Sequence, residues 1–270
     1  PTALTPLPPL PDSPYLNTRD ATYVGSSTCI ECHQQEHAGF LHTGMGRSMA
    51  SVIPEQEPPD VTYDHKPSGR RYQVVRKAGR LVHRELAITA EGEPEVLFAE
   101  HEVPYVIGSG RHTKTYVIQV EGFMYESPLT WYSKVGAWEM SPGYDKPDQI
   151  GFHREIGQEC LVCHAGRTRA KEGTVHRMEL DELSISCERC HGPGSRHVDR
   201  WTGSNADSGL KEDELDLTIV NPADLDRELS DSICAQCHLG SPAVVPSRGR
   251  SLDAYRPGLP LDAFRNGYQL

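Results

Sequence analysis

The chain has 270 residues, of which 37% are hydrophobic, and its formal net charge at pH 7 is −11. An acidic surface of this kind argues against nucleic acid and anionic membranes as partners. The sequence contains no run of about eighteen apolar residues, so we predict no membrane span.

Residues 1–20 are predicted to form a Pro-rich, extended N-terminal arm, because proline favours polyproline geometry and is excluded from helix interiors. Two interpretations stay open: a disordered spacer, or an arm that packs on a neighbouring subunit. The chain begins Pro1-Thr2-Ala3 without a signal peptide, so we interpret it as a mature exported chain whose signal has been removed. Because residue 1 is not cysteine, we expect no N-terminal lipid anchor.

The next predicted segment, residues 21–58, contains the first of four Cys-x-x-Cys-His motifs. All eight cysteines fall into such pairs, and a histidine follows each pair directly. With 13 histidines in 270 residues, composition alone would produce this in about five cases in a million. The four motifs are Cys29-x-x-Cys32-His33, Cys160-x-x-Cys163-His164, Cys187-x-x-Cys190-His191 and Cys234-x-x-Cys237-His238.

Cys-x-x-Cys-His is the attachment motif of c-type haem. The two thiols add across the vinyl groups of the haem, and the adjacent imidazole lies beneath the ring as the proximal iron ligand. We therefore predict four covalent haem c groups. Two alternatives are weaker. Zinc sites do not require a histidine after every cysteine pair, and structural disulfides rarely all close loops this short.

Around the first motif, a short helix is predicted over residues 29–41, capped by Ser27 or Thr28 and ended by Gly44 and Gly46. Residues 59–145 contain no cysteine and are predicted to form a small antiparallel β module inserted after the first haem segment. Hairpin turns are expected at residues 77–80 and 121–122. The predicted strands are residues 71–75, 81–86 and 115–120.

The last predicted segment, residues 146–270, carries three motifs and is expected to form short helices joined by loops, such as a helix over residues 224–238. Little apolar sequence is available there, so we expect the haems, as large apolar plates, to supply the core. The predicted fold class is therefore mixed: mostly short helices and loops packed around four covalent haems, with an inserted small antiparallel β module.

Four irons need up to four further ligands, and thioether as well as imidazole can bind haem iron. His197 follows a Gly-Pro-Gly turn after the third motif, and His112 follows a glycine-rich loop that permits close backbone approach to a flat cofactor. His83 alternates with Val82 in a predicted strand and is expected to face solvent. The other candidates are His37, His42, His65, His101, His153, His176, Met45, Met49, Met124, Met140 and Met178.

Several segments form a specific combination: Tyr23-Val24-Gly25-Ser26, Thr43-Gly44-Met45-Gly46-Arg47-Ser48, Tyr105-Val106-Ile107-Gly108-Ser109-Gly110-x-His112, Leu129-x-Trp131-Tyr132, Met140-Ser141-Pro142-Gly143-Tyr144-Asp145, Cys187-x-x-Cys190-His191-Gly192-Pro193-Gly194 and Ile219-Val220-Asn221-Pro222. With them the chain resembles the cytochrome c-554-like multihaem family, especially the branch in which such a cytochrome precedes tetratricopeptide repeats. The resemblance covers most of residues 21–262.

The resemblance implies a compact array of closely packed haems with mostly histidine-ligated iron, serving electron transfer. It also implies distal-ligand roles for His65, His112 and His197, with Met45 as the fourth. In the shorter nitrifier-type members a histidine usually occupies the place of Met45, so one iron here is expected to be His/Met-ligated or five-coordinate. Relatives in the repeat-containing branch continue beyond residues 255–261, so we expect this chain to be an N-terminal portion or a trimmed form of a longer product.

The predicted function is an electron carrier or conduit, periplasmic or extracellular, without catalytic residues. Its predicted partners are other redox proteins or neighbouring copies of itself, in a homo-oligomer or filament. One alternative is a haem redox enzyme that acts on a small nitrogen or oxygen species at an open iron. A third class is a haem-based sensor or a structural subunit of a larger complex.

Overall fold

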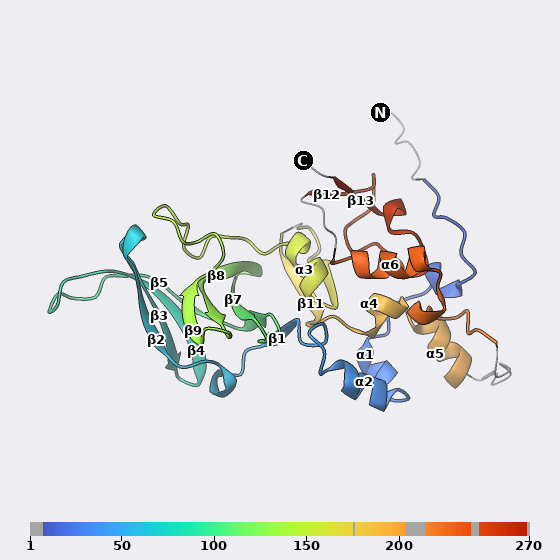
Figure 1. Cartoon of the computed structure of the whole chain (residues 1–270), viewed down its shortest axis with the longest axis horizontal. Coiled ribbons are helices and arrows are strands. Elements are labelled where there is room, and N and C mark those ends of the chain that lie inside the picture. Colours follow the sequence, from blue (N-terminus) through green and yellow to red (C-terminus); the bar gives the residue numbers. More distant parts are fainter. Residues whose placement is uncertain (1–7, 175, 204–213, 239–242, 269–270) are drawn as a thin grey trace. The chain divides into compact units, whose positions relative to one another are not determined.

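The computed structural model describes residues 8–174, 176–203, 214–238 and 243–268 (Figure 1). The chain divides into two compact units: unit 1 comprises residues 1–39 and 186–270, and unit 2 comprises residues 40–185. The first, third and fourth Cys-x-x-Cys-His motifs therefore lie in unit 1, and the second lies in unit 2. The chain leaves unit 1 after residue 39 and returns to it at residue 186. The predicted division into four consecutive segments contains no such return.

Unit 2 contains two large antiparallel sheets, with strand orders β1-β6-β7-β8-β9 and β2-β3-β4-β5, and the smaller sheet β10-β11. The bounds of its strands and helices are β1 Met49–Ser51, η2 Pro54–Gln56, β2 Val61–His65, η3 Lys66–Ser68, β3 Arg70–Lys77, β4 Arg80–Ala87, β5 Leu97–Glu102, β6 Tyr105–Ile107, β7 Thr113–Val120, β8 Phe123–Tyr132, β9 Ala137–Met140, α3 Gln158–His164, β10 Arg167–Ala170 and β11 Met178–Glu182.

The two large sheets of unit 2 share one apolar core. Tyr72 of the four-stranded sheet packs in the same buried cluster as Tyr116, Ile118 and Leu129 of the five-stranded sheet. Side chains alternate between the two faces of a strand, so Val117 points away from this cluster, yet it is also fully buried. The five-stranded sheet is therefore covered on both faces.

The second face of the five-stranded sheet carries the helix of the second motif. Val117 and Met124 lie in one buried cluster with Leu161 of α3 and Ile156, which precedes that helix. The backbone N–H of Ile156 also donates to the carbonyl of Met124 at 2.9 Å. The sheet itself thus holds α3 in place.

The predicted hairpin turns are confirmed. β3 and β4 are joined through Ala78 and Gly79, and β7 and β8 through Glu121 and Gly122. All four residues have positive φ, between 50° and 86°. Two-residue loops with positive φ at both positions match the twist of antiparallel strands, and a glycine in the second position adopts this conformation without strain.

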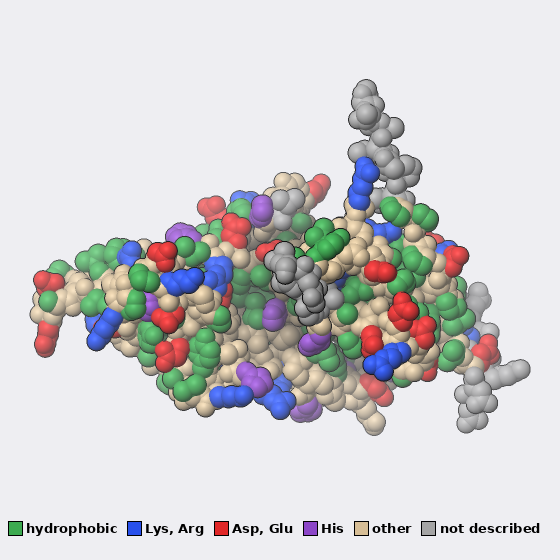
Figure 2. Space-filling view, turned by 45° about the horizontal axis from the view of Figure 1, so that its top comes forward, with side chains coloured by type: hydrophobic (Ala, Val, Ile, Leu, Met, Phe, Trp, Pro, Cys, Tyr) green, Lys and Arg blue, Asp and Glu red, His purple; other side chains and the backbone are tan. Residues whose placement is uncertain are grey.

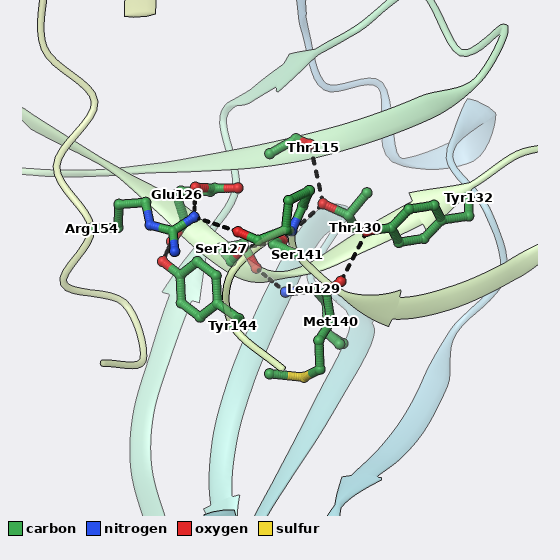
Figure 3. A network of polar contacts seen from close by, with 11 residues as sticks. Thr115, Glu126, Ser127, Leu129, Thr130, Tyr132, Met140, Ser141, Tyr144 and Arg154 are labelled. Atoms are coloured by element: carbon green, nitrogen blue, oxygen red, sulfur yellow. Dashed lines mark hydrogen bonds and ion pairs between the residues drawn. The ribbon is translucent and has the colours of Figure 1, made fainter. Parts of the chain in front are cut away.

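Segment 141–154, which leads to α3, is tied to β8 by buried polar contacts (Figure 3). The Ser141 hydroxyl donates to the carbonyl of Ser127 at 2.7 Å and lies 2.8 Å from the Thr130 hydroxyl. Further along, the Arg154 guanidinium donates to the carboxylate of Glu126 at 2.9 Å. Because buried polar groups must be paired, this network fixes the path of the chain towards the second motif.

Unit 1 has fewer strands and more short helices. Tyr15 and Val220 belong to its main buried cluster, together with Tyr255 and Phe264. Part of the predicted arm therefore packs within unit 1, while residues 1–7 lie outside the described residues. The bounds are η1 Leu16–Thr18, α1 Ser26–Ile30, α2 Gln34–Phe40, α4 Cys187–His191, α5 Ser195–Thr202, η4 Pro222–Asp224, α6 Arg227–Ala235, β12 Ala243–Pro246, η5 Leu261–Ala263 and β13 Arg265–Tyr268.

The predicted fold class was wrong: the structure is rich in strands and has four antiparallel sheets, rather than mostly short helices and loops. The prediction assumed that haem must supply most of the core, whereas β-branched and aromatic residues of unit 2 build their own core between two sheets. The helix predicted over residues 29–41 is also broken into α1 and α2.

Charged groups on the outside of unit 2 are largely paired across neighbouring strands. Examples are Arg71 of β3 with Asp64 of β2 and Arg80 of β4 with Glu102 of β5, each at 2.6 Å. Figure 2 shows acidic and basic side chains interspersed over the visible face of the molecule. Exposed pairs of this kind contribute little to stability, about 0–1 kcal/mol each, so the apolar core is the main source of stability in unit 2.

Candidate functional site

Each Cys-x-x-Cys-His motif is wound as about one helical turn. The second motif lies in α3 and the third is the whole of α4. In the first and fourth motifs the backbone N–H of His33 donates to the carbonyl of Cys29 at 2.9 Å, and that of His238 to Cys234 at 3.0 Å. Residues three and four apart share one face of a helix, so both thiols and the imidazole of a motif project from the same side.

The donor sets fit one covalently attached group for each motif. All eight cysteines are free of disulfide bonds. All twelve motif residues belong to the described part of the chain, and in that part no three His, Cys, Asp or Glu side chains converge as a bound metal ion would require. Among these described residues each cysteine pair and its histidine form a donor set of their own, which is the set that covalent haem attachment uses.

The first and third motifs are adjacent in unit 1. The thiols of Cys29 and Cys187 are hydrogen-bonded to each other, and this bond is the main reason that the pKa of Cys187 is lowered to about 6. The buried carboxylate of Glu188 accepts from the backbone N–H groups of Gly25 at 2.9 Å and Gly194 at 2.7 Å. Glu188 thus joins the chain before the first motif to the chain after the third.

The third and fourth motifs are also adjacent. The side-chain amide of Gln236, which lies between the two cysteines of the fourth motif, donates to the carbonyl of Arg189 in the third motif at 3.0 Å. Gln236 is only 4% exposed. Within unit 1 the motifs therefore follow one another in space in the order first, third, fourth.

His191 is held in the tautomer that a metal ligand needs. Its Nδ1 lies 2.8 Å from the carbonyl oxygen of Val220. A carbonyl can only accept a hydrogen bond, so Nδ1 carries the proton and the lone pair of Nε2 stays available. Such a hydrogen bond behind a ligating histidine is a common feature of metal sites.

His197 has the same kind of support, but from a carboxylate. Its Nδ1 lies 2.9 Å from Oδ2 of Asp216, so Nδ1 donates and Nε2 is again the free nitrogen. Burial raises the pKa of Asp216, but hydrogen bonds from Thr218, Trp201 and His197 outweigh this and hold it at about 2. Asp216 is a site residue that the sequence analysis missed, because nothing in its sequence neighbourhood connects it with His197.

The rings of His33 and His197 face each other across a gap. Their centroids are 6.2 Å apart and their planes differ by 26°, which is a stacked arrangement at the long end of the usual range. The two imidazoles, one from the first motif and one from α5, therefore lie next to each other in unit 1, and both would be near a haem held by the first motif.

In unit 2, two predicted ligands lie on loops next to the second motif. The Ser48 hydroxyl donates to the carbonyl of His164 at 2.7 Å, and the carbonyl of Ser48 accepts from Gly108 N–H at 2.7 Å. These contacts bring the loop that carries Met45 and the loop that carries His112 to the same end of unit 2. Both side chains are exposed, and burial lowers the pKa of His164.

His65 is buried, at 2% exposure, and both its ring nitrogens have partners. Nδ1 lies 2.7 Å from the Ser68 hydroxyl, and Nε2 lies 3.2 Å from the Asp145 carboxylate. To bind iron, His65 would have to release one of these contacts. Its role as a ligand stays a prediction.

His83 was predicted to face solvent, and this prediction was wrong. The side chain is 1% exposed, packs against Tyr116 and Trp138, and its Nδ1 lies 2.7 Å from the Ser127 hydroxyl. Burial lowers its pKa to about 3. The alternation of β4 was interpreted with the wrong face inward, because β4 is a central strand that is buried on both faces.

These features define a class of protein. Thiol pairs on helical turns and imidazoles with a free Nε2 are the donor set of a c-type cytochrome, which carries covalently bound haem c. In the part of the chain that the structure describes, no helix has the length and apolarity to cross a bilayer.

The comparison with known families agrees with this class. A family model described as "Cytochrome c554 and c-prime" matches residues 134–192, which include the second and third motifs. The match supports a cytochrome c-like family and indicates a c-type cytochrome in electron transfer. No curated protein and no solved structure matches the chain.

Proposed function

We propose that this chain is a tetrahaem c-type cytochrome that transfers electrons through a closely packed haem array. When bound, each haem supplies a reversible one-electron iron couple. The cysteine pairs anchor the groups, and the motif histidines hold the irons from one side. We further propose that the protein is exported to the periplasm or the cell exterior, where c-type cytochromes work, and that it exchanges electrons with other redox proteins or with copies of itself.

The spatial sequence of motifs in unit 1 is the observation that carries this proposal. Cys29 contacts Cys187, and Gln236 contacts Arg189, so three attachment turns form a continuous series. Groups attached to adjoining turns are held close together by the protein. Close packing is what a conduit requires, whereas a single catalytic centre would need only one haem.

The histidine geometry extends the proposal to the ligands. His33 and His197 are proposed as ligands at the same haem, because their rings lie next to each other and the proton of His197 is held on Nδ1 by Asp216. His112 and Met45 are proposed as candidates for the iron of the second motif, because their loops lie beside His164.

The test is a haem count on the native protein and on variants that each lack one cysteine pair. A pyridine haemochrome assay combined with intact-protein mass spectrometry should find four haems per chain. Replacing Cys187 and Cys190 by alanine should reduce the count to three, and the same change at any other pair should do likewise. A count that is unchanged in any of these variants would contradict the assignment of that motif.

A second candidate function follows from the distribution of ligands. Unit 1 contains three motifs but only two other histidines, His37 and His197, and no methionine. At least one of its irons therefore takes a ligand from outside unit 1 or stays open to a small molecule. An open iron would allow a haem enzyme that acts on a small nitrogen or oxygen species. A ligand from a neighbouring copy would instead favour the polymeric conduit.

Carbon monoxide separates these outcomes, because it binds only ferrous iron with an open position. Its binding should be measured on the reduced protein as monomer and as any assembly isolated by size-exclusion chromatography. No binding in either form supports a carrier with every iron six-coordinate. Binding to the monomer alone supports ligand donation between copies, and binding to both forms supports the enzyme.

A further inference from the structure

Asp216 is the centre of a compact polar cluster in unit 1, behind α5. Through Oδ2 it accepts from Nδ1 of His197 and from Nε1 of Trp201, both at 2.9 Å. Through Oδ1 it accepts from the hydroxyl and the backbone N–H of Thr218, the latter at 2.9 Å. Arg200 lies 3.9 Å from Oδ1. Both oxygens are thus held in place, and the side chain is only 16% exposed.

We propose that Asp216 is a positioning residue that lowers the reduction potential of the iron bound by His197. This inference rests on the proposed function and deepens it. A carboxylate that accepts the Nδ1 proton draws that proton away from the ring and raises the basicity of Nε2. A more basic imidazole stabilises the oxidised iron more than the reduced iron, so the potential falls.

The neighbouring motif provides an internal comparison. The Nδ1 of His191 donates to a neutral backbone carbonyl, that of Val220, at 2.8 Å. Hydrogen bonds in which one partner is ionised are roughly twice as strong as those between neutral groups. The hydrogen bond from His197 to Asp216 should therefore raise the basicity of Nε2 more than the bond from His191 to Val220 does.

The experiment is spectroelectrochemistry on the haem-loaded protein and on the variant Asp216→Asn. Asparagine keeps the size and one acceptor oxygen but removes the charge. Changing a residue that hydrogen-bonds a metal ligand typically lowers metal affinity or activity by about tenfold or more. A tenfold change in a one-electron equilibrium corresponds to about 59 mV. We expect the potential of one haem to rise by about this amount, with a change in the low-spin EPR signal of that haem alone.

Two control variants separate this role from charge and from structure. Asp199→Asn removes the same charge from an exposed position on α5, the helix that carries His197, so it should shift potentials much less. Trp201→Phe removes a competing donor from Oδ2 without changing the charge, which leaves the carboxylate more available to His197. We expect Trp201→Phe to lower the potential of the same haem. Simple loosening of the site would not shift the potential in this direction.

The outcomes are distinguishable. The inference is overturned if Asp216→Asn shifts no potential by more than Asp199→Asn does, or if Trp201→Phe shifts the same haem upward. A failure of the proposed function would show itself differently, as fewer than four haems per chain in the unaltered protein. If Asp216→Asn does not fold, the sign of the Trp201→Phe shift still decides the question.

Discussion

Unit 2 and unit 1 bury apolar surface in different ways. Unit 2 has a core of twelve buried residues between two sheets and a second cluster of seven beneath α3. Unit 1 carries three of the four motifs, and its main cluster among the described residues has seven buried members. In unit 1 the third motif helix is joined to the chain before the first motif by the buried carboxylate of Glu188.

The difference shows how one polypeptide can combine a self-sufficient scaffold with a region that depends on its cofactors. Apolar area removed from water is the main favourable term in folding. Unit 2 removes enough of it with its own side chains. Unit 1 has less of its own, so haem attached to its three motifs would complete the core. Removing haem should therefore affect the stability of the two units unequally. Polar substitutions should change stability most where haem sites adjoin.

The largest expected effect is the selective loss of unit 1 in a haem-free chain. Replacing all eight cysteines by serine prevents attachment, and unit 1 should then exchange its amide hydrogens at unprotected rates. The β3, β4 and β7 amides of unit 2 should remain protected, because their core needs no cofactor. Hydrogen-exchange mass spectrometry, with the haem-loaded chain as reference, makes the measurement. Equal protection in the two units would remove the contrast between them.

A change of coordination at one iron is the next largest effect. His197→Ala should convert one low-spin haem of the four into a high-spin form that binds carbon monoxide when reduced, because one axial ligand has been removed. EPR and absorption spectra would show this change. Arg196→Ala is the control, since that side chain is exposed on the same helix, α5, and is not a candidate ligand. Spectra of His197→Ala that match the unaltered protein would rule out His197 as a ligand.

Loss of the Glu188 carboxylate should destabilise unit 1. In Glu188→Ala the backbone N–H groups of Val24, Gly25 and Gly194 lose their acceptor. Hydrogen bonds to a charged group contribute about 1.5–3 kcal/mol each, and the losses are partly offset by water, so we expect about 3 kcal/mol in the free energy of unfolding. Denaturant titration measures it. Glu31→Ala, an exposed acid inside the first motif, should change stability by less than about 0.5 kcal/mol.

The effect that is smallest within a single pH unit concerns the core of unit 2. Burial lowers the pKa of His83 from 6.5 to about 3. Between these pH values the unfolded chain binds a proton that the folded chain does not, so stability falls as the pH decreases from 6.5 towards 3. The slope from this group is at most about 1.4 kcal/mol per pH unit. His83→Gln, which keeps a polar partner for Ser127, should flatten the pH dependence of unfolding. An unchanged slope would show that His83 is not its source.

Several local features could be predicted because short-range chemistry decides them. The turns at Ala78–Gly79 and Glu121–Gly122 follow from a glycine, which accepts positive φ, between alternating apolar segments. The three predicted strands lie within β3, β4 and β7 for the same reason. The helix over residues 224–238 was found mainly as α6, whose N-cap Asp226 accepts from the backbone N–H of Leu229.

Other features could not be predicted because they depend on partners far away in the sequence. β1 pairs with β6 across more than fifty residues, with Met49 opposite Ile107. This pairing adds β1 as an edge strand of the five-stranded sheet, and no local pattern around residues 49–51 indicates its partner. The inward orientation of His83 depends likewise on Ser127, which lies on another sheet.

Local spacing determines the covalent chemistry that is expected of this protein. Two cysteines and a histidine within five residues lie on one helical turn, whatever residues surround them. The number of attachment motifs and the redox class therefore follow from the sequence alone. Which motifs adjoin, and which nitrogen of His197 carries the proton, depend on contacts such as those of Gln236 and Asp216. Hydrogen-bond geometry of this kind exists only once distant segments have packed together, so the tertiary structure alone decided it.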